Sequence, residues 1–221
     1  MKNPGVATVQ EESRPPRRST YRHGDLYRAL LEAGVELART GGPDAVVLRE
    51  VTRQAGVVPN AAYRHFADRQ ALLEAVCDAA QARLALAIET ELAALPKKKD
   101  PVKAAHGRLR AIGAAYVKFA RAEPGLFRTA FSVPPNLDQS ASPAKAGSSG
   151  LSPFQHLSAA LDAMADAGAL PAERRKGAEF LAWSAVHGLA MLLLDGPLRQ
   201  LDDAHAAATR ERLLDMVVQG L

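Results

Sequence analysis

The chain has 221 residues, of which 48% are hydrophobic and 24% charged, and this is enough apolar material for a sizeable core. The formal net charge of +4 and the isoelectric point of about 9.4 are only mildly basic, which excludes a histone-like density of positive charge. Aromatic residues make up 5% and alanine is abundant, a balance that favours helices. Cys77 is the only cysteine, so an intrachain disulfide is excluded and a cytoplasmic location is expected. We expect neither a secretory signal nor a membrane span, because no apolar run approaches roughly 20 residues.

The N-terminal residues 1–20 combine prolines with charged residues and predict a disordered basic arm. Arginines are frequent at the end of this arm and just beyond it: Arg14, Arg17, Arg18, Arg22 and Arg28. Such a segment is either a solvated tail or a basic surface for an acidic partner.

Helical periodicity begins after the arm. Leu26, Leu30, Ala33 and Leu37 lie on one helix face, and the Gly-Gly-Pro sequence at 41–43 ends that helix. A second short helix carries Leu48, Val51 and Ala55 and stops at Gly56. A third starts at Pro59 and extends to about Phe66. Asp68 is a suitable N-cap for a long helix at about 69–95.

Further helices are expected at about 101–122, 123–132, 153–168, 172–195 and 203–219. The lysine run at 97–99 is interpreted as a solvated linker, and the Pro/Ser/Gly/Ala-rich segment 133–152 as a loop. The pattern therefore predicts an all-α protein of about nine helices.

The two short helices around Gly56 are typical of a helix-turn-helix motif at about residues 47–66. Ala62 and Phe66 are expected to face the core, and the side chains expected to face outward are Pro59, Asn60, Ala61, Tyr63 and Arg64. The major groove of DNA accepts a helix, and asparagine or arginine there bonds to base edges, while other polar groups bind phosphates. An ordinary three-helix cluster with exposed polar groups is the alternative.

The sequences LREVTRQAGV at 48–57, AYRHF at 62–66 and RQALL at 69–73 closely resemble the DNA-binding head of the TetR family of repressors. The resemblance covers about residues 20–75. It implies a helix-turn-helix domain at 21–68 and a helical dimerisation and ligand-binding domain at 69–221. It also implies double-stranded DNA, a second copy of the chain and a small-molecule effector as partners. We expect no cofactor, no metal and no membrane partner.

The resemblance also implies roles for single residues of the head. Bases would be approached by Pro59, Asn60, Ala61 and Arg64, and Arg49 would reach either a base or a phosphate. Phosphates would be held by Tyr63, His65 and Arg69. The sequence departs from the family at the two helix starts, because Val47 and Val58 stand where Ser or Thr usually caps the helix. Thr52 replaces a small alanine.

The body is expected to dimerise, because the segment 182–194 is apolar nearly all round and a helix of that kind is buried on more than one side. The last helix carries a matching apolar stripe. By resemblance, a four-helix interface would be built from Met191, Leu194, Leu213, Leu214, Val217 and Val218.

Trp183 and His187 lie one turn apart and, with the segment 123–128, resemble the C-terminal domain of one TetR subgroup. They are packing residues, with His187 bonded to a carbonyl, or pocket residues, or catalytic residues. The candidate pocket comprises Tyr116, Phe119, Phe127, Phe131, Phe154, Phe180, Trp183 and His187, and these aromatic residues are alternatively plain core. Met164 is a further apolar candidate, and Arg128 and His156 are candidate polar anchors.

The sequence therefore predicts a ligand-responsive repressor that binds a palindromic operator as a homodimer and associates with the nucleoid when bound to DNA. An enzyme is the first rival, but no phosphate-binding loop, metal spacing or nucleophile motif supports it. A helical interaction protein that has lost DNA binding is the second.

Overall fold

A computed structural model describes residues 23–133 and 139–221. These residues form ten α-helices and two short 3-10 helices, and no strand occurs among them. The predicted all-α class is confirmed. The predicted basic arm at 1–20, with Arg14, Arg17 and Arg18, lies outside the described residues, as do Arg22 and residues 134–138.

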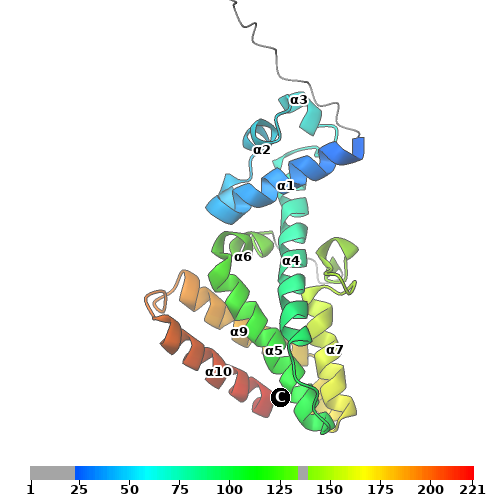
Figure 1. Cartoon of the computed structure of the whole chain (residues 1–221), viewed down its shortest axis with the longest axis vertical. Helices are drawn as coiled ribbons and strands as arrows, with labels where there is room; N and C mark the ends of the chain where they lie inside the picture. The colour runs from blue at the N-terminus through cyan, green and yellow to red at the C-terminus, as the bar shows by residue number, and fades with distance from the viewer. Residues whose placement is uncertain (1–22, 134–138) are drawn as a thin grey trace, which may run out of the picture.

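Three helices form a small head at one end of the molecule, α1 (His23–Gly41), α2 (Leu48–Gln54) and α3 (Pro59–Ala62) (Figure 1). The chain leaves α1 at Gly42 and passes through η1 (Pro43–Ala45). It leaves α2 at Gly56. Both glycines have a φ of 69°, a left-handed conformation that favours glycine, so both predicted turns are confirmed.

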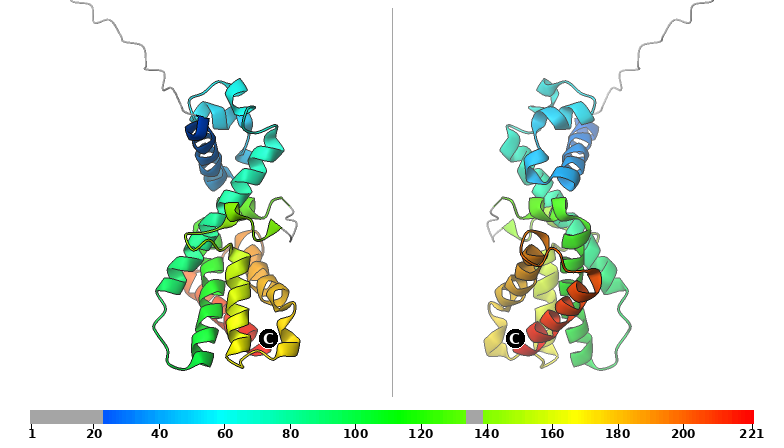
Figure 2. Two further views of the ribbon diagram at one scale, coloured as in Figure 1. Left: turned by 90° about the vertical axis from the view of Figure 1, so that its right-hand side faces the viewer. Right: turned by 90° about the vertical axis from the view of Figure 1, so that its left-hand side faces the viewer.

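A single long helix, α4 (Arg69–Ala93), joins the head to the rest of the chain (Figures 1 and 2). It begins where predicted, because the Asp68 carboxylate accepts a hydrogen bond of 2.8 Å from the Ala71 amide. Its first half packs against α1, and its second half enters the body. The expected domain boundary at 68 and 69 therefore falls at the start of a helix that both parts share.

The body is a helical bundle around α5. Its helices are α5 (Pro101–Ala122), α6 (Pro124–Ala130), α7 (Pro153–Asp166), α8 (Ala172–Arg175), α9 (Ala178–Leu194) and α10 (Asp203–Gly220). Helix α5 packs against α4, α6, α7, α9 and α10, while η3 (Pro143–Lys145) lies on α4. Figure 2 shows α9 and α10 together on one side of the bundle.

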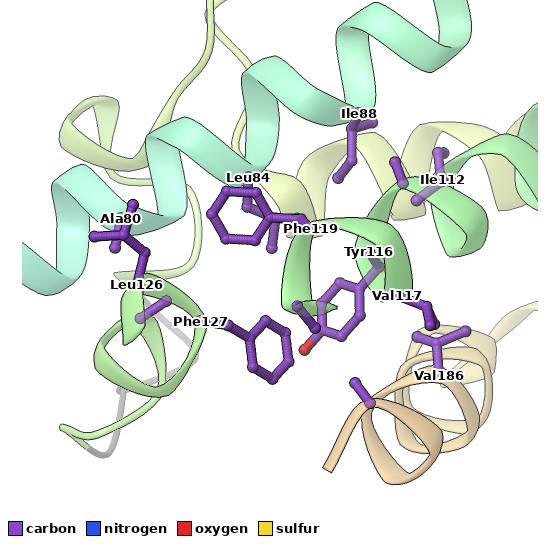
Figure 3. Close-up of a cluster of buried hydrophobic side chains, with 14 of the residues drawn as sticks. Ala80, Leu84, Ile88, Ile112, Tyr116, Val117, Phe119, Leu126, Phe127 and Val186 are labelled. Carbon is purple, nitrogen blue, oxygen red and sulfur yellow. The ribbon is translucent and has the colours of Figure 1, made fainter. Parts of the chain in front are cut away.

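The core of the body forms where α4, α5, α6 and α9 meet (Figure 3). Leu84 and Ile88 from α4, Leu126 and Phe127 from α6 are all fully buried there. Their burial removes apolar surface from water and is the main stabilising contribution to this bundle. Met164 is also fully buried in the core.

The structure differs from the prediction at two helix ends. The segment 172–195 is divided, because Gly177 has a φ of 80° and starts α9 after a break; this raises the predicted nine helices to ten. Helix α3 ends at Ala62, and the chain continues to Phe66 as a turn held by hydrogen bonds to the Ala62 carbonyl. Among the described helices, none is long and apolar enough to cross a membrane.

Candidate DNA-binding head and internal cavities

Helix α3 presents a polar, exposed surface. Pro59, Asn60, Tyr63 and Arg64 are all exposed, with 56% of Tyr63 accessible to solvent, and Ala61 is half-buried. Ala62 and Phe66 are buried beneath them, as the four-residue spacing predicted. The side chains expected at the bases are therefore held outward by a fixed core contact, the arrangement a recognition helix requires.

Helix α2 supports α3 and carries Arg49, which is exposed. Neither Val47 nor Val58 makes a side-chain capping hydrogen bond, which confirms that both motif helices lack this cap. Thr52 is buried and donates its hydroxyl to the Arg49 carbonyl at 2.9 Å. The hydroxyl is thus satisfied within the helix, while the rest of the side chain packs in the core.

His65 lies half-buried beside two aromatic rings. The Tyr27 ring stacks on Phe66 at 5.3 Å and lies 6.1 Å from the His65 ring. These contacts connect the end of the recognition segment, residues 59–66, to α1. The stacking of Tyr27 was not foreseen, although its spacing from Leu30 and Leu31 along α1 places it beside the core-facing side.

Arg69 makes a contact that sequence reasoning missed. Its Nε atom donates to the Val46 carbonyl at 2.9 Å, and its Nη2 atom donates to the Pro43 carbonyl at 2.9 Å. The first turn of α4 is thereby tied to the segment between α1 and α2. The phosphate contact expected of Arg69 remains a prediction. The two hydrogen bonds to carbonyl groups show that Arg69 also stabilises the fold of the head.

An apolar cavity lies inside the body between α4, α5, α7, α9 and α10. Its volume is about 70 Å³, which makes it small. Four of the predicted pocket residues line it: Tyr116, Phe131, Phe154 and Trp183. The remaining lining is mostly aliphatic and comes from Ile88, Leu109, Ile112, Leu157, Val186, Leu214, Val217 and Val218, with polar residues at Gln81, Arg110, Ser140 and Lys145.

The other predicted pocket residues lie elsewhere. Phe119 and Phe127 are buried in the core beside the cavity, because α5 and α6 close over them (Figure 3). Phe180 is 47% exposed on α9, with its ring 6.5 Å from Phe154. His187 lies behind Tyr116 and is not part of the lining.

Trp183, Tyr116 and His187 form one hydrogen-bonded chain. The Trp183 indole N–H donates to the Tyr116 oxygen at 3.1 Å, and that oxygen lies 2.7 Å from His187 Nδ1. Because an indole only donates, the Tyr116 oxygen accepts from Trp183, and the Tyr116 hydroxyl can itself donate to Nδ1 when the imidazole proton is on Nε2. Burial raises the pKa of Tyr116 and lowers the pKa of His187. The bond of His187 is thus to a hydroxyl and not to a carbonyl.

A second, polar cavity adjoins the apolar one and has a volume of about 440 Å³. It is lined by Glu74, Cys77, Asp78, Gln81, Val133, Gln139, Ser142 and Lys145. Gln81 and Lys145 line both cavities. Burial raises the pKa of Asp78, and the nearby Lys145 partly opposes this effect.

Cys77 fills a core position. It is 4% exposed and its thiol donates to the Thr129 carbonyl at 2.9 Å, and burial raises the pKa of the thiol. A buried thiol with a raised pKa is a poor nucleophile. Among the described residues, no group of three or more His, Cys, Asp or Glu side chains is placed to hold a metal ion.

Two family models match the chain. The model described as "Bacterial regulatory proteins, tetR family" matches residues 30–76, and the model described as "Tetracyclin repressor-like, C-terminal domain" matches residues 109–217. The chain belongs to the TetR family of transcription regulators. The DNA-binding head and the helical body are both accounted for by these two models.

Solved structures of similar fold agree with the TetR assignment. A protein of unknown function from Rhodococcus sp. RHA1 is 26% identical, with a TM-score of 0.64 over 92% of this chain and 99% of that one. The regulator FadR from Bacillus subtilis, in complex with stearoyl-CoA, is 16% identical, with a TM-score of 0.61 over 88% and 99%. A TetR variant from Acinetobacter baumannii AYE, in complex with minocycline, is 17% identical, with a TM-score of 0.57 over 91% and 96%. The search of curated proteins returned no match.

The two candidate polar anchors have partners of their own in this TetR-family body. Arg128 donates to the Asp195 carboxylate through Nε and Nη2, which joins α6 to the end of α9. His156 Nε2 lies 3.5 Å from Glu89, whose carboxylate also accepts the amides of Ser148 and Ser149. Neither side chain lines the apolar cavity.

The residues expected at a dimer interface divide into two groups. Met191 is exposed, and Leu194 and Leu213 are half-buried. Leu214 is buried against Gly113 of α5, and Val217 and Val218 line the apolar cavity. Leu214 of α10 therefore packs against α5 of its own chain, and the dimer interface expected on α9 and α10 stays a prediction. The outer face of α9 carries other exposed apolar residues, Leu181 and Leu192.

Proposed function

We propose that this TetR-family regulator is a ligand-responsive repressor that binds a palindromic operator as a homodimer. The observation that carries the proposal is the outward presentation of Asn60, Tyr63 and Arg64 on α3 above a buried Ala62 and Phe66. Because this core contact already holds the backbone of α3 in place, little backbone entropy is lost when its side chains enter a groove.

The residues of the head divide by chemistry. Arg49, Asn60 and Arg64 suit base edges, since asparagine and arginine make bidentate hydrogen bonds there, and Pro59 and Ala61 allow close approach to the bases. Tyr63 and His65 suit phosphate oxygens, which set the register of the head on the duplex. Arg69 would also bind a phosphate, through the guanidinium N–H groups that do not bond to the Val46 and Pro43 carbonyls.

A single head of this size makes few contacts, so two heads are needed for a specific site. Two copies would place them about one helical turn of DNA apart, and the two-fold axis of the protein would match a palindrome. The exposed apolar face of α9, with Leu181, Gly188 and Leu192, and Met216 on α10 supports association of two bodies. Of the six residues that the sequence suggests for the interface, Met191 is the exposed one.

The internal cavities support a small-molecule effector. Two structures of similar fold contain such a molecule, stearoyl-CoA in one and minocycline in the other. The dimer would have one state whose heads match the operator spacing and one whose heads do not. An effector with higher affinity for the second state would weaken DNA binding, by an amount set by the ratio of its affinities for the two states. The expected place of action is in the cytoplasm, at the nucleoid. No enzymatic step is part of this function.

Selection of bound duplexes from a random DNA pool tests the proposal. We expect a two-fold symmetric consensus, and binding that weakens steeply with salt as phosphate contacts are lost. Tyr63→Ala should weaken binding to all sequences, whereas Asn60→Ala should relax the consensus at one position in each half-site. Arg83→Ala, on the exposed side of α4 in the body, is the matched control and should change neither. An unsymmetric consensus or salt-independent binding would contradict the proposal.

A further inference from the structure

We propose that the effector is a slender amphipathic carboxylic acid, whose apolar chain fills the apolar cavity and whose carboxylate is held by Lys145. This inference rests on the proposed ligand-responsive function and specifies the chemistry of its ligand. It depends on a buried ammonium group at the junction of two cavities of opposite character.

Lys145 is an unusual residue for the interior. It is only 4% exposed, although lysine is almost never fully buried unless its charge is paired. Its Nζ atom donates to the Gln139 carbonyl at 3.0 Å, and the Asp78 carboxylate lies 3.7 Å away, beyond hydrogen-bonding distance. An ammonium group has three donors. Within the described residues, the Gln139 carbonyl uses one donor and Asp78 forms a long ion pair with the ammonium group, so an anion would compete with Asp78 for the remaining donors.

The position of Lys145 connects the two cavities. Together with Gln81 it lines the apolar cavity of about 70 Å³ and the polar cavity of about 440 Å³. A ligand with its charge at this junction would place an apolar part beside Phe131, Tyr116 and Trp183 on one side. Its polar end would meet water and polar side chains on the other.

The shape of the apolar cavity selects for a slender chain. Its small volume lies between aromatic rings and the aliphatic side chains of Leu157 and Val186, so a broad rigid ring system would have to displace several packed residues. An alkyl chain gains about 0.8 kcal/mol for each buried CH₂ group and follows the space that is open. The core of the body therefore favours a straight-chain tail.

The charges around Lys145 select for a monoanion. Glu74 and Asp78 line the polar cavity and repel a dianion such as a phosphate monoester. A single carboxylate instead completes the hydrogen bonding of one ammonium group and forms a charge-assisted pair with it. A cationic ligand is disfavoured because it would lie against Lys145 itself.

Trp183 provides the measurement, because it is the only tryptophan of the chain and its side chain lines the apolar cavity. We would titrate the full-length protein without DNA and follow tryptophan fluorescence. The probes are dodecanoate, dodecan-1-ol and dodecyl phosphate, which share a tail and differ in the charge of the head. Dodecanoate should bind most tightly, by about tenfold or more over the alcohol.

Variants separate a role in binding from a role in folding. Lys145→Met keeps the length of the side chain and should reduce the affinity for dodecanoate about tenfold or more while leaving that for the alcohol unchanged. Asp78→Asn removes the competing carboxylate and should tighten the binding of dodecanoate. Lys97→Met, on the exposed loop after α4, is the matched control and should bind all three probes as the wild type does.

Equal binding of acid and alcohol by the wild type would overturn the proposal, as would a Lys145→Met variant that loses both together. If Lys145→Met does not fold, as judged by its helical circular dichroism, then an unchanged affinity of Asp78→Asn for dodecanoate overturns it. Binding of dodecanoate that leaves operator affinity unchanged would instead refute the ligand-responsive function and leave the assigned ligand class in place.

Discussion

Gly125, the second residue of α6, lies directly against the backbone carbonyl of Ala38 near the end of α1. A Cβ atom at this position would overlap the carbonyl oxygens of Ala38 and Arg39. The same junction holds an ion pair of 3.1 Å between Arg39 and Glu123. The head and the body therefore touch at a second place besides the continuous helix α4, and only glycine permits so close an approach.

Substitution of Gly125 by alanine should separate α6 from α1. We expect a loss of about 1–3 kcal/mol in the free energy of unfolding, the usual cost of forcing extra atoms into a packed site, together with weaker operator binding. Gly107→Ala in α5 is the control, because its nearest neighbour is the flexible end of Lys98 at 3.7 Å. That change should stabilise the protein by about 0.5–1 kcal/mol. Urea unfolding and DNA titration measure both effects, and equal stability of the two variants would show that the junction is loose.

Much of this head was predictable because its signals are local. Glycine turns at Gly42 and Gly56, an aspartate cap at Asp68 and the spacing of Ala62 and Phe66 each act within a few residues, and each was found where expected. The contact of Arg69 with Val46 and Pro43 was missed because it joins residues more than twenty positions apart. No periodicity of the chain encodes such a pair.

The body was predicted less well, because an apolar stripe in the sequence does not identify the surface that packs against it. Leu214 and Val217 carry the same signal whether they face α5 or a second chain, and the structure turns both inward. Phe127 and Phe131 are likewise equivalent in sequence, yet one is core and the other lines a cavity. Lys145 had no sequence signal at all, since a lysine in a Ser/Gly-rich loop is normally solvated.

The missing cap of α3 should be restorable. Val58 is 70% exposed, so its side chain contributes little packing, and a serine there would accept a hydrogen bond from the first turn. We expect Val58→Ser to raise the free energy of unfolding by about 0.5–1 kcal/mol relative to Val58→Ala, which removes the same methyl groups without adding an acceptor. Thermal unfolding of the pair measures this difference. Identical melting temperatures would show that the turn before α3 does not admit a cap.

Arg69 should contribute to the stability of the head independently of DNA. The variant Arg69→Gln removes two hydrogen bonds from a charged donor to carbonyl groups, and we expect a loss of about 1.5–3 kcal/mol in the free energy of unfolding. The measurement is urea unfolding without DNA. Arg64→Gln is the control, because Arg64 is exposed on the recognition segment and its loss should affect DNA binding alone. Unchanged stability of Arg69→Gln would leave phosphate binding as its only task.

The outer face of α9 should determine the oligomeric state. Leu181 is 66% exposed, and a glutamate in its place would bury a charge at the proposed interface between two copies. We expect Leu181→Glu to sediment as a monomer and to lose most of its affinity for a two-fold site. Leu86→Glu, which adds the same charge at an exposed leucine of α4, should remain dimeric and bind DNA. A dimer formed by both variants would place the interface elsewhere.

Acid should destabilise the protein through His187. Burial lowers the pKa of His187, because the charged imidazole loses hydration in the folded protein. The unfolded chain, with a histidine pKa of about 6.5, then binds the proton more tightly. This contribution to stability is fully present above about pH 6.5 and is lost as the pH falls below it. His156, whose pKa burial also lowers, adds a loss of the same sign.

The variant His187→Asn keeps an acceptor for Tyr116 but does not titrate, so its free energy of unfolding should fall less between pH 7 and 5 than that of the wild type. Parallel pH profiles of the two proteins would show that the imidazole is already hydrated in the folded state.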